Sequence, residues 1–284
     1  MTNTSLMKSK NTIQKSNCRS SENMIFFAIF LKFKITCFLR RYDLFVLFVF
    51  LQNVSIPAQM SVRHNLAIFS ALLPPTVNLV AVSKNQPVSD ILEAYHYGQR
   101  RFGENKVQEL LNKQPQLPED IEWHFIGHLQ TNKVKYIVPF ISMIESIDSL
   151  KLLNEINGEA AKIKRVVDCL LEMFIATEES KFGLDLEEAK ALFDSGEYRA
   201  MSNIRIRGLM GMATFTDDEN RVRKEFQSLH HHFQLLKKEY FPDDPRFSEL
   251  SMGMSDDYMI AVEEGSTIVR IGTALFGERK YRSF

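Results

Sequence analysis

Three separated segments of the sequence carry residues that could bind an aldehyde-bearing phosphate compound. Lys84 ends a short apolar run over residues 77–83, which is typical of a buried strand. Partial burial of a lysine favours its neutral amine, which can form a Schiff base with an aldehyde. Two turns of small residues, at 251–255 and 270–273, offer backbone N–H groups and hydroxyls that suit a phosphate. The alternatives are a solvent-facing lysine and two ordinary turns.

Strand-like and helix-like segments alternate from Met60 onward. Strands are expected at residues 77–83, 101–103, 123–127, 142–147, 165–175, 204–212, 247–252 and 267–271. Helices are expected at residues 61–73, from Pro87, and at 107–111, 131–138, 150–163, 186–193, 217–240 and 256–263, with a short terminal helix or turn. Eight strand–helix units predict an α/β fold, a single (β/α)8 TIM barrel. A doubly wound open sheet, which would need fewer strands, is the alternative.

A closed barrel would bring the three segments together. The functional edge of such a barrel is formed by the carboxyl ends of its strands, and phosphates often bind the loops after strands 7 and 8. The two small-residue turns follow the expected seventh and eighth strands. Lys84 ends the expected first strand, which closes against the eighth. The sequence therefore predicts that the amine lies beside both turns.

Residues 1–59 differ in composition from the rest. They are polar up to Met24, and then two apolar stretches at 25–33 and 44–51 are separated by charged residues. Neither stretch is long enough to span a bilayer, and the pattern does not fit a secretory signal. We interpret residues 1–59 as upstream sequence before a true start at Met60, with a weak membrane-surface segment as the alternative. Residues 60–284 are then the barrel domain.

Charge and cysteine content exclude several classes of function. Thirty-five basic and 35 acidic residues balance, which argues against nucleic-acid binding. The three cysteines form no C-x-x-C pair, so they indicate neither a disulfide framework nor a zinc site and suit a reducing cytosol; they are Cys18, Cys37 and Cys169. The histidines at 230–232 are consecutive on an expected helix and point in different directions. No metal site is predicted.

The chain resembles the pyridoxal phosphate homeostasis protein family, whose fold-type III barrel is similar to that of alanine racemase. The segments that carry the resemblance are LVAVSK at 79–84, FGEN at 102–105, WHFIG at 123–127, LQTNK at 129–133, KFG at 181–183, RGLM at 207–210, SMGMSDDY at 251–258 and RIGT at 270–273. They extend over nearly all of residues 60–281. Residues 1–59 have no counterpart in the family.

The resemblance implies pyridoxal 5′-phosphate (PLP) as cofactor, held as a Schiff base on Lys84. The cofactor-binding residues it implies are Lys84, Asn105, Ser251, Met252, Gly253, Ser255, Arg270, Gly272 and Thr273. Asn105 could instead be the N-cap of the following helix. Arg207 could approach the pyridine ring, although its direction does not follow from the sequence. His124 and His128 flank a strand end, where they could titrate near the site or simply pack or face solvent.

The resemblance further implies a protein of intracellular PLP homeostasis that buffers the cofactor or delivers it to apo PLP-dependent enzymes. We expect it to be cytoplasmic and monomeric, without catalytic residues, metal or stable membrane association. An amino-acid racemase or decarboxylase is the alternative. Racemases with this barrel carry a second, all-β domain that supplies a tyrosine base, and few residues follow Gly277 here. A barrel that binds another phosphate without Schiff-base chemistry is a third hypothesis.

Overall fold

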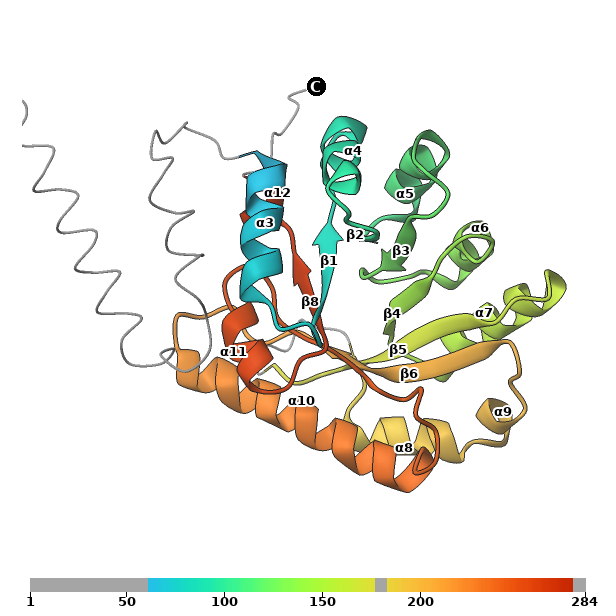
Figure 1. Ribbon diagram of the computed structural model, residues 1–284. Helices are drawn as coiled ribbons and strands as arrows, with labels where there is room; N and C mark the ends of the chain where they lie inside the picture. Colours follow the sequence, from blue (N-terminus) through green and yellow to red (C-terminus); the bar gives the residue numbers. More distant parts are fainter. Residues whose placement is uncertain (1–60, 177–182, 278–284) are drawn as a thin grey trace, which may run out of the picture. The chain divides into compact units, whose positions relative to one another are not determined.

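Eight parallel strands close into a barrel in the computed structural model, which describes residues 61–176 and 183–277 (Figure 1). The strands follow one another in chain order, and β1 pairs with both β2 and β8. They are β1 (Asn78–Val82), β2 (Arg101–Glu104), β3 (Glu122–Phe125), β4 (Met143–Ile147), β5 (Val167–Met173), β6 (Ile204–Gly211), β7 (Glu249–Ser251) and β8 (Ile268–Ile271). The predicted (β/α)8 barrel is confirmed. The predicted extension, residues 1–59, lies outside the described residues.

Helices connect the strands and surround the barrel (Figure 1). The α-helices are α3 (Val62–Leu72), α4 (Val88–His96), α5 (Val107–Lys113), α6 (Val134–Ile137), α7 (Leu150–Lys162), α8 (Leu186–Asp194), α9 (Gly196–Arg199), α10 (Glu219–Tyr240), α11 (Tyr258–Glu263) and α12 (Thr273–Phe276). Short 3-10 turns, η1 (Gln114–Gln116) and η2 (Thr131–Lys133), follow α5 and precede α6. The helix expected at 131–138 therefore begins as a 3-10 turn, and α9 was not predicted.

Local capping explains where several helices begin. Ser61 accepts a hydrogen bond from the His64 N–H at the start of α3. Asp185 and Glu188 form a reciprocal capping box at the start of α8. Such side chains satisfy N–H groups that have no partner within the helix, so the helix starts at a defined residue.

Two apolar layers hold the barrel. The larger layer lies between the strands and the helices and includes Ile91, Leu110, Ile144 and Phe226, all fully buried. The smaller cluster joins Val80, Met143, Leu170, Met210 and Ile268 from five strands. Since β1 and β5 are opposite one another in the barrel order, Val80 and Leu170 can only meet across its interior. The apolar filling leaves the carboxyl ends of the strands for polar groups.

No helix among the described residues is long and apolar enough to cross a membrane.

Candidate functional site

Lys84 lies in a tight turn directly after β1. Ser83, which precedes it, is fully buried, and Lys84 itself is half-buried. The Gln86 N–H donates to the Ser83 carbonyl at 3.0 Å, and Asn85 has a φ of 62°. A positive φ is costly for residues other than glycine, although asparagine tolerates it best. The chain therefore reverses sharply just after Lys84 and keeps this residue at the carboxyl edge of the barrel.

A buried ammonium group holds this turn. The Lys113 Nζ donates to the Ser83 carbonyl oxygen at 2.8 Å and also lies 2.8 Å from Glu104 Oε1 and 2.6 Å from Glu109 Oε1. The Ser83 hydroxyl donates to the same Glu104 oxygen at 2.7 Å, and Glu109 accepts from the Asn85 N–H at 2.6 Å. Burial raises the pKa of Glu104, although Lys113 partly offsets this effect. The backbone on both sides of Lys84 is thus fixed by charged side chains.

The two small-residue turns lie beside each other. The Arg270 N–H donates to the Gly253 carbonyl at 3.0 Å, and the Ala274 N–H donates to the Ser255 hydroxyl at 3.3 Å. Gly253 has a φ of +96°, and a Cβ on it would lie 2.6 Å from that of Ala261, so only glycine fits. Among the described residues, the N–H groups of Gly253 and Ser255 make no hydrogen bond. These donors can therefore serve an anion.

The pairing of β1 with β8 brings Lys84 close to these two turns. Ala81 of β1 lies opposite Ile271 of β8. A Cβ built on Gly272 would lie 3.4 Å from the Cβ of Val82. Lys84 follows Val82 by two residues, and Thr273 begins α12 directly after Gly272. The structure therefore brings the predicted lysine and both predicted turns to one edge of the barrel.

Ser251 and Arg270 belong to a buried polar network below the turns. The Ser251 hydroxyl donates to Glu145 Oε2 at 2.6 Å and accepts from Arg270 Nη1 at 2.5 Å. Arg270 Nη2 donates to the Gly211 carbonyl at 3.0 Å. His124 Nδ1 lies 2.6 Å from the other oxygen of Glu145. The Ser251 hydroxyl therefore has partners within this network, and the Met252 N–H donates to the Ile268 carbonyl at 3.1 Å.

The ionisable groups of this network shift one another's pKa values. Burial raises the pKa of Glu145, but the hydrogen bond from His124 and the charge of Arg270 outweigh it, so the net shift is downward. Burial lowers the pKa of the Arg270 guanidinium, and Glu145, Asp257 and Glu172 oppose this shift. Glu172 on β5 is 4 % exposed, and burial raises its pKa to about 7. A buried cation thus lies among several carboxylates under the carboxyl edge.

The site residues predicted from the sequence do not include Glu145, Glu172 or Lys113. A signal was present for the first two, because each carboxylate lies in a strand of mostly apolar residues, and buried charges need partners. Lys113 gave no such signal, since a lysine four residues after Glu109 on a helix usually marks a solvated ion pair.

The structure decides two alternatives about single residues. Lys106, not Asn105, is the N-cap of α5, so the alternative role of Asn105 as the N-cap is wrong. The Asn105 Oδ1 atom is buried and accepts no hydrogen bond from the described residues. Arg207 donates from Nη1 to Asp168 at 2.7 Å and from Nε to the Arg246 carbonyl at 2.8 Å. Asp168 and Arg246 lie near the amino ends of β5 and β7. The Arg207 side chain therefore points to the amino edge of the barrel, whereas Lys84 lies at the carboxyl edge.

His124 and His128 also have defined places. His124 is buried in the Glu145 network, whereas His128 Nδ1 lies 3.0 Å from Asp148 Oδ2 at a more exposed position. Within the described ranges no group of three or more histidine, cysteine, aspartate or glutamate residues is placed to hold a metal ion.

Comparison with known proteins extends these findings. The family model for the N-terminal domain of alanine racemase matches residues 59–280. A protein of Aquifex aeolicus named "Pyridoxal phosphate homeostasis protein" is 44% identical over 205 residues, which cover 72% of this chain and 87% of that protein. The chain belongs to the pyridoxal phosphate homeostasis protein family.

Two solved structures place this family member among related barrels. PipY of Synechococcus elongatus PCC7942, solved with PLP bound, is 36% identical, with a TM-score of 0.70 over 76% of this chain and all of PipY. Alanine racemase from Bartonella henselae is 16% identical, with a TM-score of 0.58 over 78% of this chain and 60% of the racemase. At that identity the racemase shows a shared fold alone.

Proposed function

We propose that this protein binds PLP at the carboxyl edge of the barrel, with Lys84 as the residue that forms the Schiff base, and that it acts in PLP homeostasis. The observation that carries the proposal is the meeting of Lys84 with the turns at 251–255 and 270–273, in a chain of this family. PLP-bound PipY, at 36% identity over all of its length, supports the choice of ligand.

The residues at this edge fit the chemical groups of PLP. The N–H groups of Gly253 and Ser255, with the hydroxyls of Ser255 and Thr273, would hold the phosphate, and Gly272 would let the backbone approach closely. The half-buried amine of Lys84 would condense with the aldehyde, with loss of water. This aldehyde is the chemistry that PLP itself supplies.

The other proposed cofactor residues line the same region. Arg270, held by Ser251 and Gly211, would place a fixed cation under the bound ring system, and Met252 would seal the floor as a fully buried side chain. Asn105 has a buried amide oxygen without a partner, which a polar group of the ligand would satisfy. Such an atom costs about 1–3 kcal/mol when it is left unpaired.

The proposed role is to buffer PLP or deliver it to apo PLP-dependent enzymes in the cytoplasm, as a monomer, without turning over amino acids. The name of the Aquifex relative, "Pyridoxal phosphate homeostasis protein", supports this role. A racemase or decarboxylase activity is the competing hypothesis, because the fold is shared with alanine racemase. That hypothesis requires a base within hydrogen-bond reach of the Cα proton.

Three measurements on the purified protein test the proposal. Added PLP should give the visible absorption band of a Schiff base, which Lys84→Ala should lose. The loaded protein should restore activity to an apo PLP-dependent enzyme and should not exchange the Cα protons of amino acids in deuterated water. Rapid exchange that depends on Lys84, together with no transfer, would establish the enzyme hypothesis instead.

The phosphate contacts can be tested separately. Ser255→Ala and Thr273→Ala should each weaken PLP binding by about 1.5–3 kcal/mol, the worth of a hydrogen bond to a charged group. Thr273→Ser, which keeps the hydroxyl, is the matched control and should bind PLP nearly as the parent does. Unchanged affinity in both alanine variants would move the phosphate to another place.

A further inference from the structure

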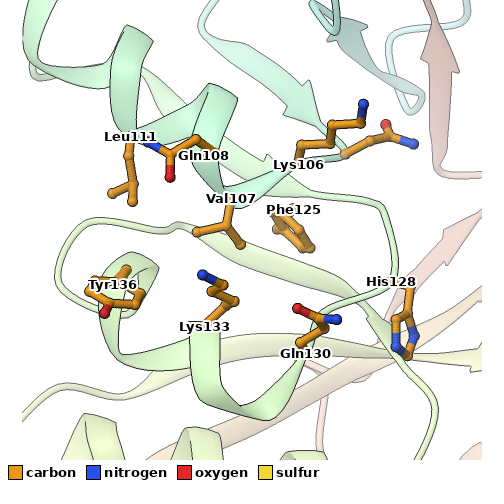
Figure 2. Close-up of a pocket in the computed structure, with 10 residues that line it drawn as sticks. Lys106, Val107, Gln108, Leu111, Phe125, His128, Gln130, Lys133 and Tyr136 are labelled. Atoms are coloured by element: carbon orange, nitrogen blue, oxygen red, sulfur yellow. The ribbon is translucent and has the colours of Figure 1, made fainter.

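A hollow with a cavity volume of about 480 Å³ lies beside the proposed cofactor edge (Figure 2). One side of the hollow is formed by α5 and the residues just before it. The other side is formed by the segment that runs from β3 through η2 to α6. Its lining includes Asn105, Lys106, Val107, Phe125, Lys133 and Tyr136. Lys84 and the two small-residue turns are not part of this lining. The hollow begins at Asn105, directly after β2, which pairs with the strand that ends before Lys84.

The charged groups of the hollow are positive. Lys106 and Lys133 both line it, and the lining contains no aspartate or glutamate. Among the described residues, neither ammonium group forms an ion pair, in contrast to Lys113, which contacts two glutamates. Figure 2 shows the Lys133 side chain rising from η2 into the hollow towards Val107. Two lysines without an ion-pair partner among the described residues make the hollow attractive to an anion.

The remaining lining gives the hollow an apolar wall with polar ends. Phe125 is 1 % exposed and lies beside Val107 in Figure 2, and Val107 and Leu111 line the hollow from α5. Tyr136, whose ring lies 5.8 Å from the Lys133 Nζ, closes one end, and His128 lies towards the other. A volume of this size suits an organic molecule rather than a bare inorganic ion.

We propose that this hollow is a second ligand site, which binds a small organic anion with a flat or apolar body. Lys133 binds the carboxylate or phosphate group, and Lys106 adds positive potential at the rim. The apolar body packs against Phe125, Val107 and Leu111. The hollow adjoins the proposed PLP site at Asn105 but contains neither Lys84 nor the two small-residue turns, so this inference does not depend on the proposed function.

The test uses phenyl phosphate and benzoate as probes, titrated into the PLP-loaded full chain by calorimetry, with the visible absorption of the protein followed in parallel. At least one probe should bind saturably without loss of that absorption. The probe that binds more tightly identifies the charged group as phosphate or carboxylate. If the chain takes up no PLP, the same titration on the unloaded chain still tests the hollow.

Variants of two lysines on the same segment show whether the hollow is the binding place. Lys133→Met should weaken probe binding about tenfold or more, as expected for a lost hydrogen bond to a charged group, and Lys133→Arg should retain most of the affinity. Lys135→Met is the matched control, because Lys135 also lies near the Tyr136 ring, at 5.1 Å, but is exposed and does not line the hollow. It should change the affinity less than about twofold.

Three results would overturn the proposal. One is the absence of saturable binding of either probe up to about 10 mM, beyond the range of ordinary small-molecule sites. Another is an equal loss of affinity in Lys133→Met and Lys135→Met, which would indicate diffuse surface charge. The third is loss of the visible absorption in proportion to the bound probe, which would place the probe at the cofactor's own phosphate site.

Discussion

The Lys113 ammonium donates to the carbonyl oxygen of Ser83 at 2.8 Å, one residue before Lys84. Lys113 is 7 % exposed and also neutralises Glu104, a carboxylate with no exposed surface. The Lys84 turn therefore depends on a buried ion pair contributed by α5 and β2. Buried ion pairs do not always stabilise a fold, but removing one partner leaves the other charged and desolvated.

Lys113→Met should therefore lower the free energy of unfolding by about 3–5 kcal/mol, because Glu104 would lose its cation inside the protein. Chemical denaturation at pH 7 would measure the change. Lys162→Met is the matched control, since the ammonium of Lys162, an exposed residue of α7, pairs with Glu159, and its loss should not be detectable. Equal effects of the two substitutions would contradict the clamping role of Lys113.

The barrel itself could be predicted from the sequence, because its eight strands are short apolar runs separated by helical segments. The apolar pattern of each run predicts a buried strand, and because consecutive strands usually lie side by side, their order along the chain predicts which strands pair. The strand limits shifted by only a few residues, as at β7, which begins at Glu249 rather than at Phe247. The position of Lys84 beside the two small-residue turns then follows from closure of the barrel, which pairs the first strand with the eighth.

The polar network could not be predicted in the same way. Ser251 and Glu145 are 106 residues apart and lie on strands that are not neighbours, so they meet only across the barrel interior. Whether a strand residue faces inward depends on register, which the sequence leaves open. The same uncertainty applied to Arg207, whose partners Asp168 and Arg246 became clear only in three dimensions.

Gly253→Ala should destabilise the protein by roughly 1–3 kcal/mol, because alanine disfavours the positive φ and its Cβ would meet that of Ala261. PLP affinity should fall as well. Gly158→Ala is the control: Gly158 is exposed within α7, and a Cβ there meets nothing within 4 Å. That change should raise the stability by about 0.5–1 kcal/mol. A Gly253→Ala protein as stable as the parent would refute the requirement for glycine in this turn.

Glu172 should make stability fall as pH rises. Burial raises its pKa from 4.5 to about 7, with Arg270 opposing the shift and Asp148 adding to it. The folded state therefore holds the proton more tightly than the unfolded state. This contribution is fully present below about pH 4.5 and is lost by about pH 7, which corresponds to roughly 3 kcal/mol.

The measurement compares the parent with Glu172→Gln by denaturant unfolding between pH 4 and pH 8. The two proteins should have similar stability at the acidic end, and the glutamine variant should gain relative to the parent as pH rises. Using the difference between them cancels the titration of other partly or fully desolvated carboxyl groups such as Glu104 and Asp257. A difference that is independent of pH would show that Glu172 titrates in its ordinary range.

A chain that begins at Met60 should fold and bind PLP as the full chain does. All eight strands lie after this residue, and α3 packs into the core through Val62, Leu66 and Phe69. Asn65 also donates to the Leu275 carbonyl at 2.8 Å, which joins α3 to α12. Thermal unfolding and PLP titration of both chains would test this. Precipitation or loss of PLP binding in the shorter chain alone would show that residues 1–59 are structural.

The assignment of Lys84 is tested most directly by chemical labelling. Borohydride reduction of the PLP-loaded protein converts a Schiff base into a stable secondary amine, and peptide mapping then locates the pyridoxyl group. The label should be found on Lys84 in the parent and should be absent from Lys84→Ala. A label found mainly on Lys106, Lys133 or another lysine would contradict the proposed cofactor site.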